Sequence, residues 1–311
     1  MSLIPETGAA TTGALDGRTQ SIAHRLLSGA GCASLLAHRL DPQVGIEFLA
    51  HGLTPSGRIV VACCPVPGDE AAGLPTTEPI AVRLDITKAS CEPGVHIVSS
   101  AVHLLGTLEW LPPRVAAQLL ADGQLPPRVA VTTTHPYGRL GVVRARRVLL
   151  HDSTGVTPMD LGPLLDACTG MPFPTCEDEF DAFDAAMGLG EDALWAIADA
   201  IVDERIAGRI CSRHDMTAGC PHTWNRIYCV DVDRHGLTLM AVEPTTTSTF
   251  FAPFDAPDGR RAAGPGGPGG GLSRGRREPD GWGRRALRPP RLRPGRRSRS
   301  GRCRAARPRA G

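Results

Sequence analysis

Five successive runs of strand-like residues between Cys32 and Trp110 constrain the fold of this chain more than any other feature. The clearest run, residues 79–90, alternates apolar and polar side chains, which is the period-two pattern of a half-buried strand. Residues 57–66 (GRIVVACCPV) are apolar and β-branched throughout, which predicts a strand buried on both faces. Several short sequential strands joined by tight turns favour an antiparallel meander that closes into a barrel.

The segments that flank these runs complete a predicted barrel domain over residues 19–166. Apolar residues at helical spacing predict a short helix over 19–29, before the first strand. Two prolines begin a predicted capping helix over 111–124, since proline is tolerated in a first helical turn. Residues 138–152 read as one returning strand, and residues 153–168 as the entry to another helix.

A second unit is predicted over residues 177–257. Its first half is acidic and has helical periodicity, and Gly188 and Gly190 divide it into two helices. A hairpin follows with its turn at 233–236, and residues 247–254 add a strand. The predicted fold class is therefore α+β: an antiparallel β-barrel followed by a small α+β domain.

The charge of the chain is divided very unevenly along its length. Residues 259–311 hold 17 of the 34 basic residues and two of the 32 acidic ones, which leaves 17 basic and 30 acidic residues elsewhere. This Arg-, Gly- and Pro-rich segment lacks the apolar residues of a core, so we expect residues 258–311 to be disordered. Three interpretations stay open: a nucleic-acid-binding arm that neutralises phosphates, a solvated linker without function, or GC-rich codons read out of frame.

The composition also predicts the cellular compartment of the protein. The sequence has no run of about 18 apolar residues, so we expect no membrane span. Residues 1–18 are rich in Gly, Ala and Thr and carry no basic patch before an apolar core, so we expect a flexible N-terminus without a signal peptide and a cytoplasmic protein. Ten cysteines without a compact spacing are expected to be reduced thiols.

The densest group of ligand-type side chains lies in the segment CSRHDMTAGCPHTW, residues 211–224. Cysteine and histidine are the ligands that zinc prefers, so Cys211, His214, Cys220 and His222 form a candidate tetrahedral metal site. Their spacing matches no standard zinc framework. A polar loop with incidental Cys and His residues, or haem ligation through one of the two histidines, are the alternatives.

The remaining histidines give weaker signals. We expect His235 to be an exposed residue of the hairpin turn. His96 and His103 lie on one predicted strand, where one of them could line a barrel pocket or be packed at the surface. His135 and Tyr137 occupy a polar loop that could touch a ligand or form a plain turn.

Residues 19–166 resemble the FMN-binding split barrel of the pyridoxamine-5′-phosphate-oxidase type. The matching pieces are AHRLLSGAGCASLLAH, GRIVVACCPVP, PIAVRLDITKAS and GRLGVVRARRVLLHDSTGVTPMD. Residues 177–255 resemble the small domain of unknown function that follows such barrels in haem-utilisation proteins and in the plastid glutamyl-tRNA-reductase-binding protein. The signature there is VDVDRHGLTLMAVE, a strand, an Asp-Arg-x-Gly turn and a second strand.

This resemblance implies a split barrel, a homodimer and a haem or FMN cofactor. Arg58, Arg83 and Lys88 are then the candidates for holding the FMN phosphate, and His214 or His222 for ligating haem iron. The family often carries a histidine in its acidic helix, and DAFDAAMGLGEDAL has none. Two functions follow as alternatives: a haem- or flavin-binding protein of haem-utilisation type that assists oxidative haem breakdown, which would make it an oxidoreductase, or a non-catalytic protein-binding module.

Overall fold

The computed structural model describes residues 7–168, 174–175, 178–216 and 220–254. These residues belong to one compact unit, which spans Met1–Gly259. The predicted disorder of residues 258–311 lies outside the described residues. Among the described helices, none is long and apolar enough to cross a bilayer.

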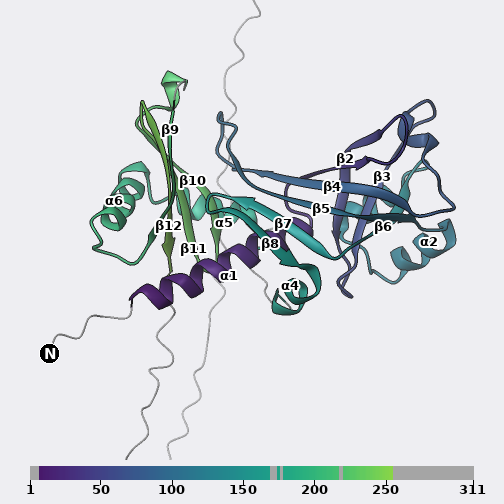
Figure 1. The fold of residues 1–311 in the computed structure, drawn as a ribbon, viewed down its shortest axis with the longest axis horizontal. Coiled ribbons are helices and arrows are strands. Elements are labelled where there is room, and N and C mark those ends of the chain that lie inside the picture. The colour runs from purple at the N-terminus through teal and green to yellow at the C-terminus, as the bar shows by residue number, and fades with distance from the viewer. Residues whose placement is uncertain (1–6, 169–173, 176–177, 217–219, 255–311) are drawn as a thin grey trace, which may run out of the picture. The chain divides into compact units, whose positions relative to one another are not determined.

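Six antiparallel strands close into a barrel, which confirms the predicted architecture (Figure 1). The strands follow the order β4-β1-β2-β3-β6-β5, and pairing between β4 and β5 closes the ring. Closure leaves these six strands without an open edge between them. The barrel strands are β1 (Cys32–Ala37), β2 (Val44–Leu53), β3 (Ile59–Cys63), β4 (Ile80–Ala89), β5 (Val98–Trp110) and β6 (Arg139–Ala145).

The predicted alternation of β4 is borne out by its burial. Val82, Leu84 and Ile86 are buried in the barrel core, whereas Arg83 points to solvent. Strand β3 is buried on both faces, as its unbroken apolar sequence predicts. Its second face is covered by α2 (Pro113–Ala121) and α3 (Pro127–Thr133), which pack against β3 and its neighbours.

The sheet divides at β5, because two different strands pair with successive parts of the same edge of this long strand. Residues Gly106–Trp110 of β5 pair with β6, and Ala101–His103 pair with β7 (Arg147–Asp152). At the point of division a side chain at Gly106 would collide with the carbonyl oxygen of Arg144. The residues predicted as one strand over 138–152 are therefore two strands with different neighbours.

The helix expected within residues 153–168 is confirmed as α4 (Leu161–Cys168). The residues before it were not predicted as a strand, but they form a turn and strand β8 (Gly155–Asp160), which pairs with β7. The reason is local. The carboxylate of Asp152 accepts hydrogen bonds from the backbone N–H and hydroxyl of Thr154, and Gly155 supplies a φ of 119°.

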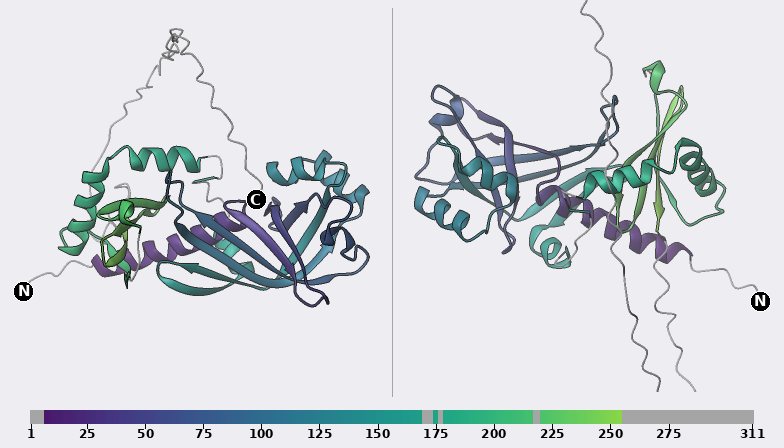
Figure 2. Two further views of the ribbon diagram at one scale, coloured as in Figure 1. Left: turned by 90° about the horizontal axis from the view of Figure 1, so that it is seen from above. Right: turned by 180° about the vertical axis from the view of Figure 1, so that it is seen from behind.

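A separate four-stranded sheet follows, in the order β10-β11-β12-β9. The predicted hairpin is confirmed in β10 (Arg226–Asp233) and β11 (Gly236–Val242), and the predicted last strand in β12 (Thr246–Pro253). Helices α5 (Glu179–Met187) and α6 (Glu191–Val202) cover one face of this sheet (Figure 2). They are separated at Gly188 and Gly190, as predicted.

Strand β9 (Arg209–Asp215) also differs from the prediction, which placed the end of a helix and a loop in this segment. It pairs with β12 at the edge of the sheet. Cys211 and His214 of the predicted metal cluster therefore lie on a strand.

Helix α1 (Thr7–Leu27) begins well before the predicted Thr19, so residues 7–18 are helical rather than loose. It contacts β5 and β7 of the barrel sheet as well as α4 and β12, and so it lies against both sheets (Figure 1). Ile22, Leu26 and Leu27 are fully buried in the barrel core cluster.

Candidate functional site

The largest concentration of titratable and hydroxyl side chains lies in a cleft between the two sheets. Its volume is about 740 Å³, within the range of small-molecule and cofactor sites. The barrel side is formed by the start of β5 and the β7–β8 hairpin, and the opposite wall by β9, β10, β11 and β12. These elements are labelled in Figure 1.

The register of the small sheet places its polar side chains on the cleft wall. His214 lies opposite Thr247, and Ser212 lies opposite Thr249. Met240 is also opposite Thr249, so these five side chains share one face of the sheet. The other face packs against α5 and α6. The alternation of the strands therefore separates an apolar face under the helices from a polar face in the cleft.

An arginine clamp forms the floor of the cleft. The guanidinium of Arg18, on α1, donates to Asp152 Oδ2 at 2.6 Å and to Thr238 Oγ1 at 2.9 Å. It also lies 5.6 Å from the ring centre of Phe251. Both Arg18 and the carboxylate of Asp152 are almost completely buried. The clamp joins the helix to both sheets and leaves neither of its charges free for a ligand.

Two histidines mark the barrel side of the cleft. His151 lines it, and the ring of His151 meets that of His103 edge-on with centres 4.8 Å apart. His103 Nδ1 lies 2.6 Å from Asp85 Oδ1, which selects the tautomer with a proton on Nδ1. His103 therefore lies on the outer face of the barrel, held by Asp85, rather than in the barrel interior.

Two further side chains of β9 complete the site. His214 lines the cleft and has no hydrogen-bond or ion-pair partner among the described residues, whereas Arg213 is opposite Ser248 and directs its side chain to the other face of the sheet. Cys211 also lines the cleft, and burial raises the pKa of its thiol, so that the thiol is protonated at neutral pH. The imidazole of His214 is therefore open to a ligand, whereas the imidazole of His151 contacts the ring of His103.

The predicted four-residue metal site is not formed. Within the described ranges no group of three or more His, Cys, Asp or Glu side chains could hold a metal ion. Cys220 Sγ and His222 Nδ1 contact each other at 3.1 Å in an exposed turn, whereas Cys211 and His214 line the cleft. The two halves of the motif are separated because β9 directs its side chains into the cleft.

The three predicted phosphate ligands are also dispersed. Arg58 is exposed beside Ser56 at the β2–β3 turn, and Arg83 pairs with Asp85 on the outer face of the barrel at 2.7 Å. Lys88 is buried and already engaged by two carboxylates. The structure therefore does not bring Arg58, Arg83 and Lys88 together as a phosphate site.

Lys88 belongs to a buried ion network that joins β4, α1, α5 and β10. Its Nζ contacts Glu179 and lies 2.8 Å from Asp231 Oδ1. Arg25 holds the same Asp231 through two hydrogen bonds, at 3.0 and 2.7 Å. Burial alone would raise the pKa of Asp231, but the two cations hold it below its usual value. Asp233 lies 3.8 Å from Arg25, and burial together with the charge of Asp231 raises its pKa.

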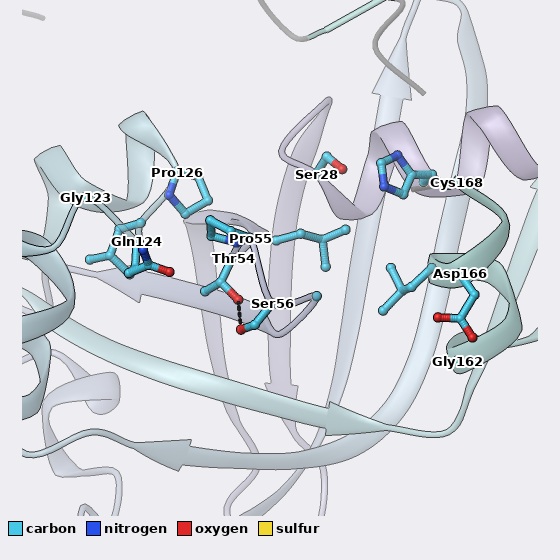
Figure 3. Close-up of a pocket in the computed structure, with 15 residues that line it drawn as sticks. Ser28, Thr54, Pro55, Ser56, Gly123, Gln124, Pro126, Gly162, Asp166 and Cys168 are labelled. Atoms are coloured by element: carbon cyan, nitrogen blue, oxygen red, sulfur yellow. Dashed lines mark hydrogen bonds between the residues drawn. The ribbon is translucent and has the colours of Figure 1, made fainter. Parts of the chain in front are cut away.

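A second hollow, of about 780 Å³, lies between the end of α1, the β2–β3 turn, the α2–α3 connection and α4 (Figure 3). Its titratable groups are His24, Asp166 and the thiol of Cys168. Burial, and then the charge of Arg25, lower the pKa of His24. With no free cation and no converging polar cluster among its described lining residues, it is a weaker candidate than the cleft.

The other histidines are placed as follows. His235 is half-buried rather than exposed, because its ring lies against α1 where any side chain at Gly17 would collide with it. Burial lowers its pKa. His96, His135 and Tyr137 are exposed, and none of them lines the cleft.

Several residues of the cleft were not identified from the sequence. The hydroxyls of Ser100, Ser212 and Thr249 carry no sequence signal, because Ser and Thr are common on any strand. Arg18 was missed because the segment before Thr19 was expected to be loose. A helical reading of residues 7–27 would have placed Arg18 and Arg25 seven residues apart on one face.

Comparison with known proteins gives structural neighbours only. No protein-family model matches the sequence, and no curated protein matches it. A haem-binding protein from Mycobacterium smegmatis has a TM-score of 0.39 at 18% identity, over 82% of this chain and 93% of that one. A protein of unknown function from Agrobacterium tumefaciens has a TM-score of 0.30 at 12% identity, over 74% of this chain and 86% of that one.

A third neighbour belongs to the pyridoxine phosphate oxidase family. It is a protein from Clostridium acetobutylicum related to general stress protein 26, with a TM-score of 0.29 at 9% identity, over 50% of this chain and 98% of that one. Likeness at this level carries no activity to this chain. The split barrel itself rests on the strand order and closure of the sheet, and membership of the second unit in a particular family stays a prediction.

Proposed function

We propose that this protein binds haem in the cleft, with His214 as the axial ligand of the iron. The observation that supports this most directly is the imidazole of His214, which faces the cleft without a partner among the described residues. A neutral imidazole is a common ligand of haem iron. Of the two histidines that the sequence singles out, His214 lines the cleft and His222 does not.

The rest of the lining suits a flat, largely apolar ligand with acidic groups. Val98, Val156, Val230 and Met240 offer apolar contacts on both sides of the cleft, and the hydroxyls of Ser212 and Thr249 can donate hydrogen bonds to a carboxylate. Flavin mononucleotide fits less well, because its phosphate needs several free cations and Arg58, Arg83 and Lys88 are dispersed. Haem is therefore the favoured cofactor.

Haem iron, when bound, supplies oxygen and redox chemistry, and assisting oxidative haem breakdown is the reaction class that we propose. The role of the protein in this proposal is to bind and orient the ligand. His214 would bind the iron, and the clamp between Arg18 and Asp152 would keep the two walls in place.

The test is a haemin titration of the full-length protein, followed by the Soret band. We expect saturation at one equivalent, and we expect His214→Ala to weaken binding by roughly tenfold or more because it removes the iron ligand. His222→Ala is the matched control, since His222 belongs to the same segment but lies outside the cleft. Equal binding by wild type and His214→Ala, or equal losses in both variants, would contradict the assignment.

One observation favours the homodimer that the resemblance implies. The outer face of β5 and β7 exposes two large apolar side chains. Leu105 is 66% exposed, and Leu149 is exposed as well. Apolar patches of this kind often mark interaction surfaces, and the occupant that we propose is a second copy of the chain.

Light scattering of the full-length protein tests this assembly. We expect a dimer in the wild type and a monomer in Leu105→Glu, because a carboxylate would have to be desolvated in the contact. Val115→Glu is the control, since Val115 is an exposed apolar residue of α2, away from this face. A monomeric wild type, or a dimer unaffected by Leu105→Glu, would exclude this face as the contact.

A further inference from the structure

Three hydroxyl groups in the cleft have no hydrogen-bond partner among the described residues. They belong to Ser100 on β5, Ser212 on β9 and Thr249 on β12, and all three residues line the cleft. Ser100 is 4% exposed and Thr249 is 2% exposed. The buried side-chain oxygen and nitrogen atoms that lack a partner lie elsewhere in the described residues, so these three hydroxyls are accessible from the cleft. A ligand group in the cleft can therefore form hydrogen bonds with them.

The other hydroxyls around the cleft are already occupied. Thr238 and Ser153 accept hydrogen bonds from Arg18, Thr247 donates to Met216 Sδ, and Ser99 donates to the carbonyl oxygen of Lys88. Ser100, Ser212 and Thr249 therefore differ from the other hydroxyl residues of the described lining, whose side chains already form hydrogen bonds within the protein.

The positions of Ser212 and Thr249 relative to His214 are fixed by the strand geometry. Ser212 and Thr249 are directly opposite each other in the register, and His214 and Thr247 form the next pair on the same face. Alternate residues of a strand lie about 7 Å apart. A ligand with its centre at His214 would thus bring a peripheral substituent, rather than its centre, to Ser212 and Thr249.

The charges around this position allow an acidic substituent. Asp152 is neutralised by Arg18, and Asp231 by Arg25 and Lys88. No unpaired carboxylate in the described lining therefore repels an anion, and hydroxyl groups can donate to both oxygens of a carboxylate.

We propose that Ser100, Ser212 and Thr249 form a carboxylate subsite, which selects tetrapyrroles that carry free acid side chains. The proposal rests on the haem-binding function of the same cleft and adds the residues that determine its specificity. Esterified or otherwise neutral tetrapyrroles would leave the three hydroxyls without an anionic acceptor.

The test uses iron-free protoporphyrin IX and its dimethyl ester, since neither ligand depends on coordination by His214. Binding to the full-length protein is followed by porphyrin fluorescence at one low detergent concentration. We expect wild type to bind the free acid roughly tenfold more tightly than the diester, as two charge-assisted hydrogen bonds allow. In the Ser212→Ala, Thr249→Val double variant we expect this ratio to fall to near one.

Thr107→Val is the matched control, because Thr107 is an exposed residue of β5 outside the cleft, and it should keep the wild-type ratio. The ligand-free double variant should be about as stable as wild type, since the two hydroxyls have no hydrogen-bond partner among the described residues. A wild type that binds acid and diester equally, or a double variant that keeps the preference, would overturn the subsite. If the protein prefers the free acid but binds haemin equally well after His214→Ala, the carboxylate subsite stands and only the assignment of His214 as the iron ligand is refuted.

Discussion

Replacing Lys88 by methionine tests the interpretation that this lysine holds the structure together and does not bind a cofactor. The substitution keeps most of the side-chain volume and removes one of the two cations of the buried network. Breaking a buried pair by removing one partner costs about 3–5 kcal/mol. Asp231 would keep its two hydrogen bonds from Arg25, and Glu179 would keep Arg25 at 3.4 Å. We therefore expect Lys88→Met to lower the free energy of unfolding by about 3 kcal/mol, the lower end of this range.

Urea unfolding of the full-length protein, followed by tryptophan fluorescence and circular dichroism, measures this loss. With an m-value of about 3 kcal/mol per molar, the midpoint should fall by about 1 M. Arg83→Met is the matched control on the same strand. Arg83 is 51% exposed in its pair with Asp85, and such pairs contribute about 1 kcal/mol or less.

Adding Glu179→Gln to Lys88→Met sharpens the test. The double variant again has a balanced network, so we expect it to recover part of the lost stability. A Lys88→Met protein as stable as wild type would refute this interpretation. Lys88 would then again be a candidate for ligand binding, because removal of a functional side chain often leaves the stability of a protein unchanged or improved.

Two further predictions concern protonation. Asp233 has a raised pKa in the folded protein, so its ionised form destabilises the fold and the loss grows as pH rises above its ordinary value. Asp233→Asn should therefore gain stability relative to wild type as pH rises from 4 through the folded pKa of Asp233, and a difference that stays constant between pH 4 and pH 8 in urea unfolding would contradict this. Burial raises the pKa of Cys63 to about 11 and that of Cys229 to about 12, whereas Cys220 is exposed. Iodoacetamide should label Cys220 in the native protein and reach Cys63 and Cys229 only after unfolding, as mass spectrometry of peptides would show.

The parts of the fold that were predicted correctly share one physical signal. Strand β4 alternates, β3 is apolar throughout, and Gly190 between the two acidic helices adopts a φ of 84°. Each of these features follows from burial or from a local backbone requirement. Such requirements are visible in a short window of sequence.

The parts that were missed depend on partners far away in the sequence. Strands β8 and β9 bury few side chains and are held by main-chain pairing to β7 and β12, so neither carries an apolar period. Lys88 looked free because its partner Asp231 follows 143 residues later. His214 was identified by its residue type, but only the register of β9 shows that it faces a cleft and that His222 does not.

The early start of α1 has a consequence for how the chain folds. Arg18 pairs with Asp152, which is 134 residues away in the sequence, and Arg25 pairs with Asp231, which is 206 residues away. Contacts of such long sequence separation slow folding, because the chain entropy of a large loop is lost before they form. Ile22, Leu26 and Leu27 can pack into the barrel core before these ion pairs form, so the two arginines of α1 are paired last. A chain interrupted before β10 would leave Arg25 without Asp231, and we expect such a fragment to be degraded rather than to accumulate.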